Sequence, residues 1–246
     1  MLREIRANAD GAPAVSYIRR EYADRPWADR VAVVGAGAAD VVLREMSGWT
    51  VTAPKAFAEE LVRRGARLGR ATHRMTCDLS VRRPPAEWAN PALPSPLRFE
   101  SFDRSIDDLL PAWRAAYAPG HPDHRQEYDD DSVLRDRFGM MVAGAAFGAL
   151  SSLSCVVCDS GAVVAGLVLN HVPGKIPWGG PFITDLFRHP SYPGTGTALL
   201  RRTLTRAAAS DLRVVGLVVT DTNPALRVYT RHGFEVFDSP VTVTIP

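Results

Sequence analysis

The sequence is poor in cysteine and has no long apolar run. Cys77, Cys155 and Cys158 are its three cysteines, too few for a disulfide framework and typical of a reducing compartment. No apolar stretch reaches the roughly 18 residues that a membrane span needs. The first 30 residues carry charges throughout and lack the apolar core of a signal peptide. We therefore expect a soluble, cytoplasmic protein that does not bind membranes.

An excess of one charge is also absent. The 29 basic residues are scattered among 27 acidic ones, for a formal net charge of +2. No basic patch suggests nucleic acid as a partner. The six histidines are dispersed and form no ligand cluster, so we expect no metal. The 46% of hydrophobic residues is enough for a sizeable folded core.

Cys155 and Cys158 have the spacing of a redox or metal-binding pair. They lie in or beside the apolar run Leu153–Val157, which reads as a strand. Side chains three apart on a strand point to opposite faces, so the two sulfurs should diverge. This favours buried structural thiols over a redox or metal site.

Five prolines in residues 82–96 (RRPPAEWANPALPSP) make a helix or central strand impossible there and indicate a semi-rigid spacer. We place the domain boundary in this segment. The predicted organisation is therefore an N-terminal domain at 1–81, a proline-rich linker at 82–96 and a C-terminal domain at 97–246.

The N-terminal domain alternates strands and helices. Helical spacing predicts a short helix over 13–23, and an apolar strand, Val31–Val34, then leads into Gly35-Ala-Gly37. This glycine pair is the one candidate for a dinucleotide fingerprint, but Asp40 replaces the third glycine, so a strand-to-helix turn is favoured over a Rossmann site. The remaining elements expected are a strand at 49–53, a helix from Pro54 to Gly65 and a strand at 66–79.

In the C-terminal domain, Ser105 and Asp108 form a capping-box pattern before an apolar helical face. Pro111 falls within that face and predicts a kink or a later start. The polar segment 119–131 should be an exposed loop. The other elements expected are a helix near 133–141 and strands at 97–102, 152–158, 162–171, 214–220, 235–237 and 241–245.

A glycine turn, Pro193–Ala198, connects an apolar strand to an amphipathic helix. Gly194 and Gly196 let backbone N–H groups approach a ligand closely. The helix that follows directs its unpaired N–H groups and positive dipole end at the turn. A pyrophosphate would suit this geometry, although many strand-to-helix corners also need glycine.

Two segments in combination resemble the GNAT N-acetyltransferase superfamily. Asp185-Leu-Phe-Arg-His-Pro190 followed by the glycine turn looks like its acetyl-CoA-binding segment, and Asn223-Pro-Ala-Leu-Arg-Val-Tyr229-Thr-Arg-His-Gly233-Phe234 looks like its next signature. The resemblance covers about 150 C-terminal residues. It implies an α/β (mixed α+β) fold, in which a mostly antiparallel twisted sheet is flanked by helices. Here a smaller α/β half-domain would precede that sheet.

The resemblance also implies a set of functional residues. Leu186 and Arg188 would pair with the pantetheine arm of acetyl-CoA through their backbone, the amides from Gly194 would take the pyrophosphate, and Asn223 would contact the arm from the other side. The full set implied for the co-substrate is Leu186, Phe187, Arg188, Pro193, Gly194, Thr195, Gly196, Thr197, Ala198, Asn223 and Leu226. The arginine or glutamine that opens the family pattern is replaced by Pro193 or Ser191, so backbone amides alone should hold the pyrophosphate.

Tyr229 stands where the family protonates the departing CoA thiolate, and Asp185 where several members face the amine. With reference pKa values of about 10 for tyrosine and about 8.5 for a thiol, full transfer runs uphill by about 2 kcal/mol. Unless the pKa of Tyr229 is lowered, it should act more as a hydrogen-bond donor. The alternatives are that Tyr229 is a core tyrosine and that Asp185 is a strand-end carboxylate that makes local hydrogen bonds.

The acceptor side is less readable. The loop residues Glu127, Asp129, Asp130 and Asp131 could attract a cationic amine, but solvated loop charge is favoured. His121 and His124 are further candidates for a base acting through water, and Trp178 could line the pocket or anchor a turn.

The first half of the sequence resembles a degenerate copy of the second half. Thr50–Pro54, the helix that contains Phe57 and Leu61, and Val62–Leu68 parallel Val218–Val236, with Leu61 where Tyr229 stands. Residues 1–80 are therefore interpreted as a degenerate, non-catalytic GNAT-like half-domain, with an unrelated α/β cap as the alternative.

These features together predict an N-acetyltransferase. The acetyl group would pass from acetyl-CoA to a primary amine of a small molecule by direct attack in a ternary complex, in a monomer or homodimer. A non-catalytic acyl-CoA-binding or sensing module is the alternative, and a Rossmann oxidoreductase is a distant third.

Overall fold

The computed structural model describes residues 2–22 and 25–246 and divides the chain into two compact units. The first unit contains the residues up to Arg74 and returns to include Phe237–Pro246, and the second spans Met75–Val236. This division differs from the predicted boundary at 82–96, which falls inside the second unit. The last ten residues belong to the first unit because strand β13 (Pro240–Thr244) pairs there with β4 (Thr50–Pro54) and β5 (Arg67–Asp78).

The first unit is a sheet with helices on one face. Its strand order is β1-β2-β3-β4-β13-β5, where β1 is Glu4–Ala7, β2 is Pro13–Tyr22 and β3 is Arg25–Val33. Helices α1 (Ala38–Glu45) and α2 (Lys55–Arg63) contribute to a core with alternate residues of the central strands. The sheet is antiparallel except for the β3–β4 pair.

The helix predicted over 13–23 is wrong, because residues 13–22 form strand β2; residue 23 lies outside the described residues. β2 pairs with β1 on one edge and β3 on the other. Ala14, Val15, Tyr17 and Ile18 are all buried, and a strand buried on both faces shows no simple alternation. The apolar spacing therefore resembled a helical stripe.

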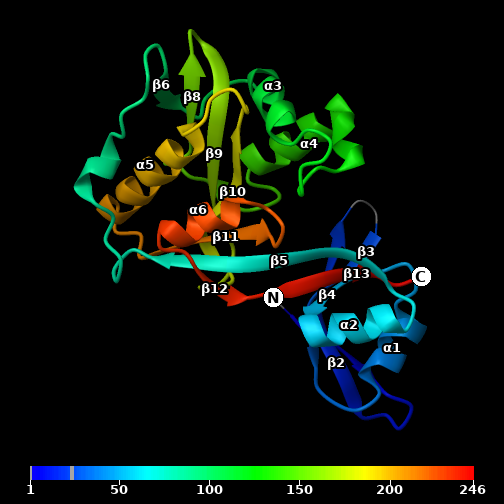
Figure 1. The fold of residues 1–246 in the computed structure, drawn as a ribbon. Coiled ribbons are helices and arrows are strands. Elements are labelled where there is room, and N and C mark those ends of the chain that lie inside the picture. The colour runs from blue at the N-terminus through cyan, green and yellow to red at the C-terminus, as the bar shows by residue number, and fades with distance from the viewer. Residues whose placement is uncertain (1, 23–24) are drawn as a thin grey trace. The chain divides into compact units, whose positions relative to one another are not determined.

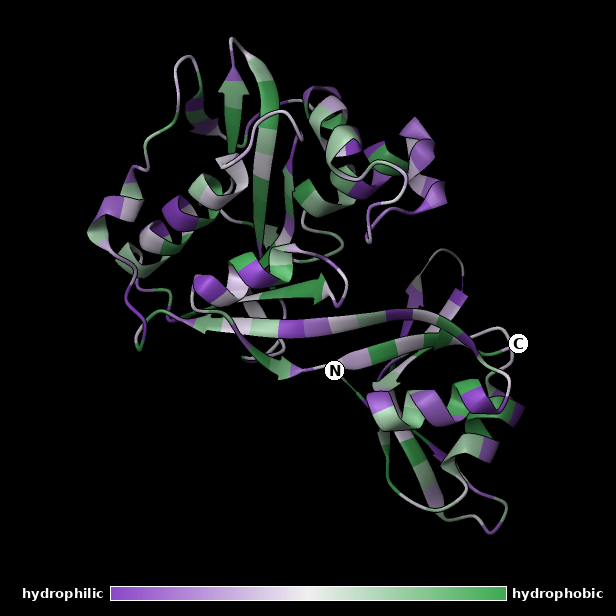
Figure 2. Cartoon of the chain, viewed as in Figure 1, coloured by the Kyte–Doolittle hydropathy of each residue, from purple (hydrophilic) through white to green (hydrophobic). Residues whose placement is uncertain are grey.

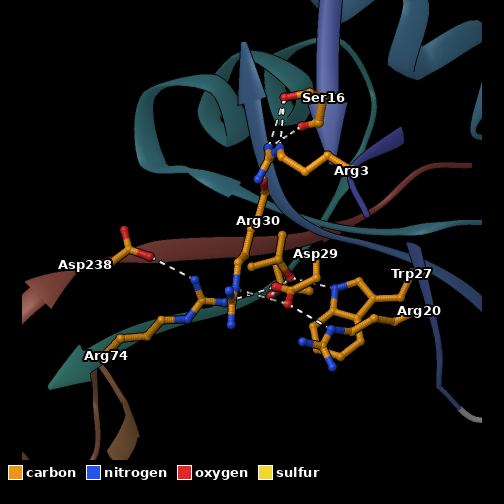
Figure 3. Close-up of polar contacts among 10 residues, drawn as sticks. Arg3, Ser16, Arg20, Trp27, Asp29, Arg30, Arg74 and Asp238 are labelled. Carbon is orange, nitrogen blue, oxygen red and sulfur yellow. Dashed lines mark hydrogen bonds and ion pairs between the residues drawn. The ribbon is translucent and has the colours of Figure 1, made fainter. Parts of the chain in front are cut away.

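The face of the first sheet opposite the helices carries a polar network around Asp29 (Figure 3). Asp29 is 3% exposed, and its two oxygens accept hydrogen bonds from Arg20 Nε (3.0 Å) and Arg74 Nη2 (3.0 Å). Arg74 also bonds Asp238 at 2.9 Å. Beside it, Trp27 Nε1 donates to Thr52 (2.9 Å). Burial of this carboxylate is possible because several guanidinium groups surround it.

The second unit is a larger sheet between two helical layers (Figure 1). Its order is β5-β11-β10-β9-β8-β6, with β12 against β5 and β7 against β9. The strands are β6 (Arg98–Ser101), β7 (Ala149–Leu150), β8 (Cys155–Asp159), β9 (Ala162–Val172), β10 (Gly180–Arg188), β11 (Val214–Thr220) and β12 (Glu235–Asp238). The helices are α3 (Ile106–Ala116), α4 (Asp131–Val142), α5 (Thr195–Ala209) and α6 (Ala225–Arg231), with short 3₁₀ helices η1 (Ala86–Ala89) and η2 (Gln126–Asp129).

Each face of the second sheet has its own core. Helices α5 and α6 pack on one face and α3 and α4 on the other, and the hydrophobic colour of β8 and β9 between them is visible in Figure 2. Cys155 belongs to the first core and Cys158 to the second, so the two sulfurs diverge as predicted. Helix α3 begins at the predicted capping box of Ser105 and Asp108 and continues through Pro111.

The two units repeat one order of elements. In each, a strand leads to a helix whose N-cap glycine has a positive φ, 75° at Gly37 and 86° at Gly194. A parallel strand, a second helix, a glycine (Gly65 or Gly233) and another strand follow. Each sheet also contains a strand that is distant in sequence from its neighbours. In the first sheet β13 lies between β4 and β5, and in the second sheet β5, which from Met75 onward belongs to that unit, pairs with both β11 and β12. Both strands thereby occupy the same place in their sheets.

Candidate active site

Strands β10 and β11 pair over only two positions and then separate. The parallel pairs are Phe182 with Gly216 and Ile183 with Leu217. Between Ile183 and Asp185 the pairing of β10 with β9 shifts register. This bulge turns Asp185 toward the α3–α4 core although Ile183 faces α5. The bulge thus separates the two faces at the point where β10 leaves β11.

Beyond the bulge, alternate residues of β10 turn their backbone groups away from β9. The N–H of His189 donates to Val164 O at 2.7 Å, so by antiparallel alternation the groups of Phe187 face β9 and those of Leu186 and Arg188 face the open side. On that side, Leu186 O accepts the Tyr117 hydroxyl at 3.2 Å. The side chain of Phe187 is 1% exposed and packs in the α3–α4 core. Two of these three predicted residues therefore offer backbone groups to a ligand.

The glycine turn forms the N-terminus of α5. Gly194 is the N-cap, with φ 86° and no side-chain capping bond, and the first helical hydrogen bond runs from Ala198 N to Gly194 O at 2.9 Å. The amides of Thr195, Gly196 and Thr197 precede that bond and have no helical acceptor. The Thr195 hydroxyl is directed elsewhere, to Tyr192 O at 2.8 Å. Three backbone donors and the positive helix end are left for an anion.

An arginine side chain lies beside this turn. A Cβ at Gly196 would be 3.7 Å from Arg188 Cδ, and Arg188 Nη1 donates to Pro190 O at 3.1 Å. No carboxylate of the described residues forms an ion pair with Arg188. The guanidinium comes from β10 and not from the position where the family pattern has arginine or glutamine. Sequence comparison over the turn alone would miss it.

Tyr229 lies on α6 and is 8% exposed. Its ring meets Phe234 edge to face at 5.8 Å, and its hydroxyl has no hydrogen bond to a described residue. Burial, followed by the charges of Asp185 and Asp123, raises the pKa of Tyr229 above its usual value. The phenol therefore keeps its proton at neutral pH and can donate it in a hydrogen bond.

Asp185 is enclosed by three donors, from α3, from its C-cap residue and from α4. Its Oδ2 accepts from Trp113 Nε1 (3.1 Å) and Arg137 Nη2 (3.3 Å), and its Oδ1 from the Tyr117 hydroxyl (2.9 Å). The side chain of Asp185 is 2% exposed. Burial raises the pKa of Tyr117 well above its usual range, and the Asp185 charge adds to this. Burial would lower the pKa of Arg137, but Asp185 and the hydroxyls of Tyr128 and Tyr117 raise it overall.

The 119–131 loop is fastened to the end of β11 through Asp123. Its carboxylate accepts hydrogen bonds from the Thr220 hydroxyl and from Asn223 Nδ2, the latter at 2.6 Å. Asn223 Oδ1 accepts the N–H of Ala225 at 2.8 Å. Both ends of the Asn223 amide are thus engaged within the protein. Leu226, one turn further, packs beside the α5–α6 core.

The two loop histidines are held in different ways. His121 Nδ1 accepts the N–H of Asp123 at 3.1 Å, which assigns the proton to Nε2, and burial lowers the pKa of His121. In this arrangement neither nitrogen of the neutral ring is free to take a proton. His124 Nδ1 contacts Tyr117 O at 2.9 Å. Glu127, Asp129, Asp130 and Asp131 are exposed, and Asp131 pairs with Arg114.

Comparisons with known proteins identify the family. The family model described as "Acetyltransferase (GNAT) family" matches residues 106–234. The chain belongs to the GNAT acetyltransferase family. No curated protein matches the sequence significantly.

Solved GNAT structures share the fold over nearly the whole chain. A GCN5-related N-acetyltransferase from Sphaerobacter thermophilus is 17% identical with a TM-score of 0.60, over 98% of this chain and 79% of that one. A tandem GNAT protein from the clavulanic acid biosynthesis pathway is 16% identical with a TM-score of 0.59, over 96% and 80%. The similarity in fold extends through the first unit of this chain.

Three residues of the second unit (Met75–Val236, called the GNAT domain below) are not predicted as part of the candidate site. Trp113 and Tyr117 belong to the predicted apolar face of a helix, and no sequence pattern points to Arg137.

No helix among the described residues is long and apolar enough to span a bilayer. Within residues 2–22 and 25–246, no three His, Cys, Asp or Glu side chains gather as metal ligands would.

Replacing Asp185 by asparagine should destabilise the GNAT domain by about 1–3 kcal/mol, because Arg137 would keep its charge in a mostly buried site without a counterion. Urea unfolding would measure this. Asp129→Asn is the matched control, since that carboxylate is 58% exposed and should change stability by less than about 0.5 kcal/mol. Equal unfolding midpoints for the two variants would contradict the role given to Asp185.

Proposed function

We propose that this protein is an acetyl-CoA-dependent N-acetyltransferase that acetylates a primary amine of a small molecule. The observation that carries the proposal is the unpaired hydroxyl of the buried Tyr229 in the domain that contains the open side of β10 and the free amides of α5. A core tyrosine would be expected to have a hydrogen-bond partner for its hydroxyl. In this position the group is available to a leaving thiolate.

The acetyl donor would be bound by the chain's own backbone. The groups of Leu186 and Arg188 would pair with the amides of the pantetheine arm as an added strand does. The amides of Thr195–Thr197 would hold the pyrophosphate, with the Arg188 guanidinium close by. Asn223 would shape the other side of this site by fixing Asp123 and not by a free amide of its own.

The reaction would be a direct transfer in a ternary complex. The neutral amine attacks the thioester carbonyl carbon, the C–N bond forms, the C–S bond breaks and the ammonium proton leaves to water. Tyr229 donates a hydrogen bond to the sulfur as negative charge develops there. The raised pKa of Tyr229 makes full proton transfer to the thiolate more costly than the reference pKa values suggest. We therefore assign Tyr229 mainly a stabilising role.

Asp185 would be a positioning residue and not the group that binds the amine. Both of its oxygens are already hydrogen-bonded, and Arg137 offsets its charge. Its bond to Tyr117 fixes a hydroxyl that also contacts Leu186 O on the open side.

We place the reaction in the cytoplasm, since the three cysteines are free and buried, as in proteins of reducing compartments.

A thiol-release assay with acetyl-CoA across a panel of primary amines, alongside calorimetric titration of CoA, tests the proposal. Release with at least one amine, dependent on Tyr229, is the expected result. CoA binding without release on any amine would favour a non-catalytic acyl-CoA-binding module. Absence of CoA binding would overturn both.

Arg188→Met should weaken CoA binding about tenfold, because a guanidinium–phosphate contact is a charge-assisted hydrogen bond. The salt dependence of the calorimetric dissociation constant should also become shallower. Arg231→Met, an exposed arginine at the end of α6, serves as the control and should bind CoA as the unmodified protein does. If Arg188→Met binds normally, backbone amides alone hold the pyrophosphate.

A further inference from the structure

The loop segment 117–124 spans the gap between the two strands that separate at the candidate site. Tyr117, the C-cap residue of α3, contacts Leu186 O of β10 through its hydroxyl at 3.2 Å. The carboxylate of Asp123 accepts a hydrogen bond from the hydroxyl of Thr220, the last residue of β11. Beyond their two paired positions, β10 and β11 are therefore connected through this loop.

Contacts within the segment fix the place of Asp123. The His121 ring meets the Tyr117 ring edge to face at 5.0 Å, and His121 Nδ1 accepts the N–H of Asp123 at 3.1 Å. His124 Nδ1 lies 2.9 Å from Tyr117 O. Asn223, just before α6, also donates to the Asp123 carboxylate, at 2.6 Å. The carboxylate is thus held near the start of α6 by the loop and by the end of β11.

This position is close to Tyr229, which lies on α6. Burial is the largest cause of the raised pKa of Tyr229, and the charges of Asp185 and Asp123 add to it. On Tyr117, where burial is again the largest cause, both charges raise the pKa as well. The hydroxyl of Tyr229, which is 8% exposed and has no hydrogen bond to a described residue, therefore shares one site with two carboxylates.

The two carboxylates of this site are held by different kinds of donor. Asp185 forms an ion pair with Arg137 at 3.3 Å, which offsets its charge. On Asp123, Oδ1 accepts the neutral hydroxyl of Thr220 and Oδ2 the neutral amide of Asn223. A carboxylate offers about four acceptor positions, so these two bonds leave Asp123 able to accept an N–H of a ligand.

We propose that Asp123 binds the substrate amine in its ammonium form, so that the protein selects alkylamines that are protonated at neutral pH over weakly basic amines. This inference rests on the proposed function and names its substrate class. The attacking nitrogen must reach the carbonyl carbon beside the sulfur that Tyr229 contacts. Asp123 is the carboxylate near that point whose hydrogen-bond partners Thr220 and Asn223 are neutral.

The ammonium would donate to Asp123 and give one proton to solvent water before attack. Carboxylates are much weaker bases than alkylamines, so Asp123 orients the nitrogen and water takes the proton. The nitrogen lone pair then forms the C–N bond, the C–S bond breaks, and the second proton leaves to water as the amide forms. The charge of Asp123 therefore acts on substrate binding more than on the leaving group.

A pair of amines that differ in charge tests this role. The pair consists of the alkylamine that gives the fastest thiol release and its β,β-difluorinated analogue, which is similar in shape but mostly neutral at pH 8. Calorimetric titration of each amine into the unmodified protein saturated with CoA should show the charged amine binding at least tenfold more tightly, because a charge-assisted hydrogen bond is stronger than a neutral one.

Asp123→Asn removes the charge and keeps an amide that can bond Thr220 and Asn223. The KM of the charged amine and its calorimetric dissociation constant should both rise about tenfold. The kcat, the binding of the difluorinated analogue and the binding of CoA should each change less than threefold. Thermal unfolding identifies a variant that fails to fold, and the comparison of the two amines on the unmodified protein tests the proposal without it.

Two variants separate the charge of Asp123 from its role in fastening the loop. Thr220→Val removes a hydrogen bond to Asp123 but keeps the charge, so the preference for the charged amine should persist. Glu127→Gln changes a carboxylate of the same loop that is 48% exposed, and this variant should bind both amines as the unmodified protein does.

The inference and the proposed function fail in different ways. If amines are acetylated but the unmodified protein binds both members of the pair equally, or Asp123→Asn weakens both equally, Asp123 only fastens the loop and the inference is wrong. If no amine of the panel releases thiol, the proposed function fails and the inference with it.

Discussion

Phenylalanine at position 229 should lower kcat about a hundredfold while the dissociation constant of acetyl-CoA changes less than twofold. A single preorganised donor at a developing negative charge typically contributes 10²–10³-fold in rate, about 2.7–4 kcal/mol. The phenol donates little to the neutral thioester of the ground state, so binding should be almost unaffected. Because the Tyr229 ring keeps its contact with Phe234 and its hydroxyl has no hydrogen bond to a described residue, the substitution should preserve the fold. Steady-state kinetics with an accepted amine, together with calorimetry, measure the two effects separately.

The leaving group provides a sharper test of this role. If Tyr229 stabilises a thiolate, an acetyl thioester of a more acidic thiol should recover part of the lost rate in the phenylalanine variant. Tyr117→Phe is the matched control, since it removes a hydroxyl that is bonded to Asp185 and Leu186 O, and the acidity of the thiol should not rescue it. Unchanged kcat for Tyr229→Phe would remove the residue from the mechanism and leave it as a core tyrosine.

Local sequence patterns predicted the parts of the site that are themselves local. The glycine turn, the N-terminus of α5 and the place of Tyr229 on α6 each depend on residues within one strand–helix corner or one helix. The capping box of α3 is similarly complete within four residues, from Ser105 to Asp108. For such elements, propensity and hydrogen bonding between near neighbours agree with the final fold.

The contacts around Asp185 could not be predicted, because their partners are distant in sequence. Trp113 and Arg137 are 72 and 48 residues away from it, and only the bulge in β10 turns the carboxylate toward them. No sequence signal specified that bulge, since Thr184 is an ordinary strand residue. The same reason applies to Arg188: its neighbour Gly196 was recognised as part of the turn, but the direction of the arginine side chain depends on tertiary packing.

The first unit shows a different limit. The repeat was recognised from the strand, helix and glycine around Leu61, but the counterpart of the glycine turn was not. Gly37 provides it: its φ of 75° at the N-cap of α1 matches Gly194 at α5. The favoured interpretation of Gly35-Ala-Gly37, a strand-to-helix turn, is confirmed, but its equivalence to the turn at Gly194 is not evident from the sequence. Gly35 has a separate reason to be glycine, since a Cβ there would lie 2.2 Å from Pro13 O.

The C-terminal strand should be essential to the first unit. β13 lies between β4 and β5 and pairs with both, and Val241, Val243 and Ile245 are each at most 6% exposed. Burial of three such side chains contributes roughly 5–9 kcal/mol, comparable to the whole stability of a small domain. Deleting residues 240–246 should therefore unfold the first unit, although these residues are 162 or more positions from β4 and β5.

A single substitution tests the same point without shortening the chain. Val243→Asp places an unpaired charge at a position with 0% exposure and should cost at least about 4 kcal/mol. Amide hydrogen exchange in β4 and in Arg67–Arg74 should then become fast, because both strands lose a neighbour. Val236→Asp, at a valine that is 47% exposed, is the control and should leave these amides protected. Persistent protection in Val243→Asp would mean that β4 and β5 are stabilised by their helices alone. Pairing with β13 would then contribute little to the stability of the first unit.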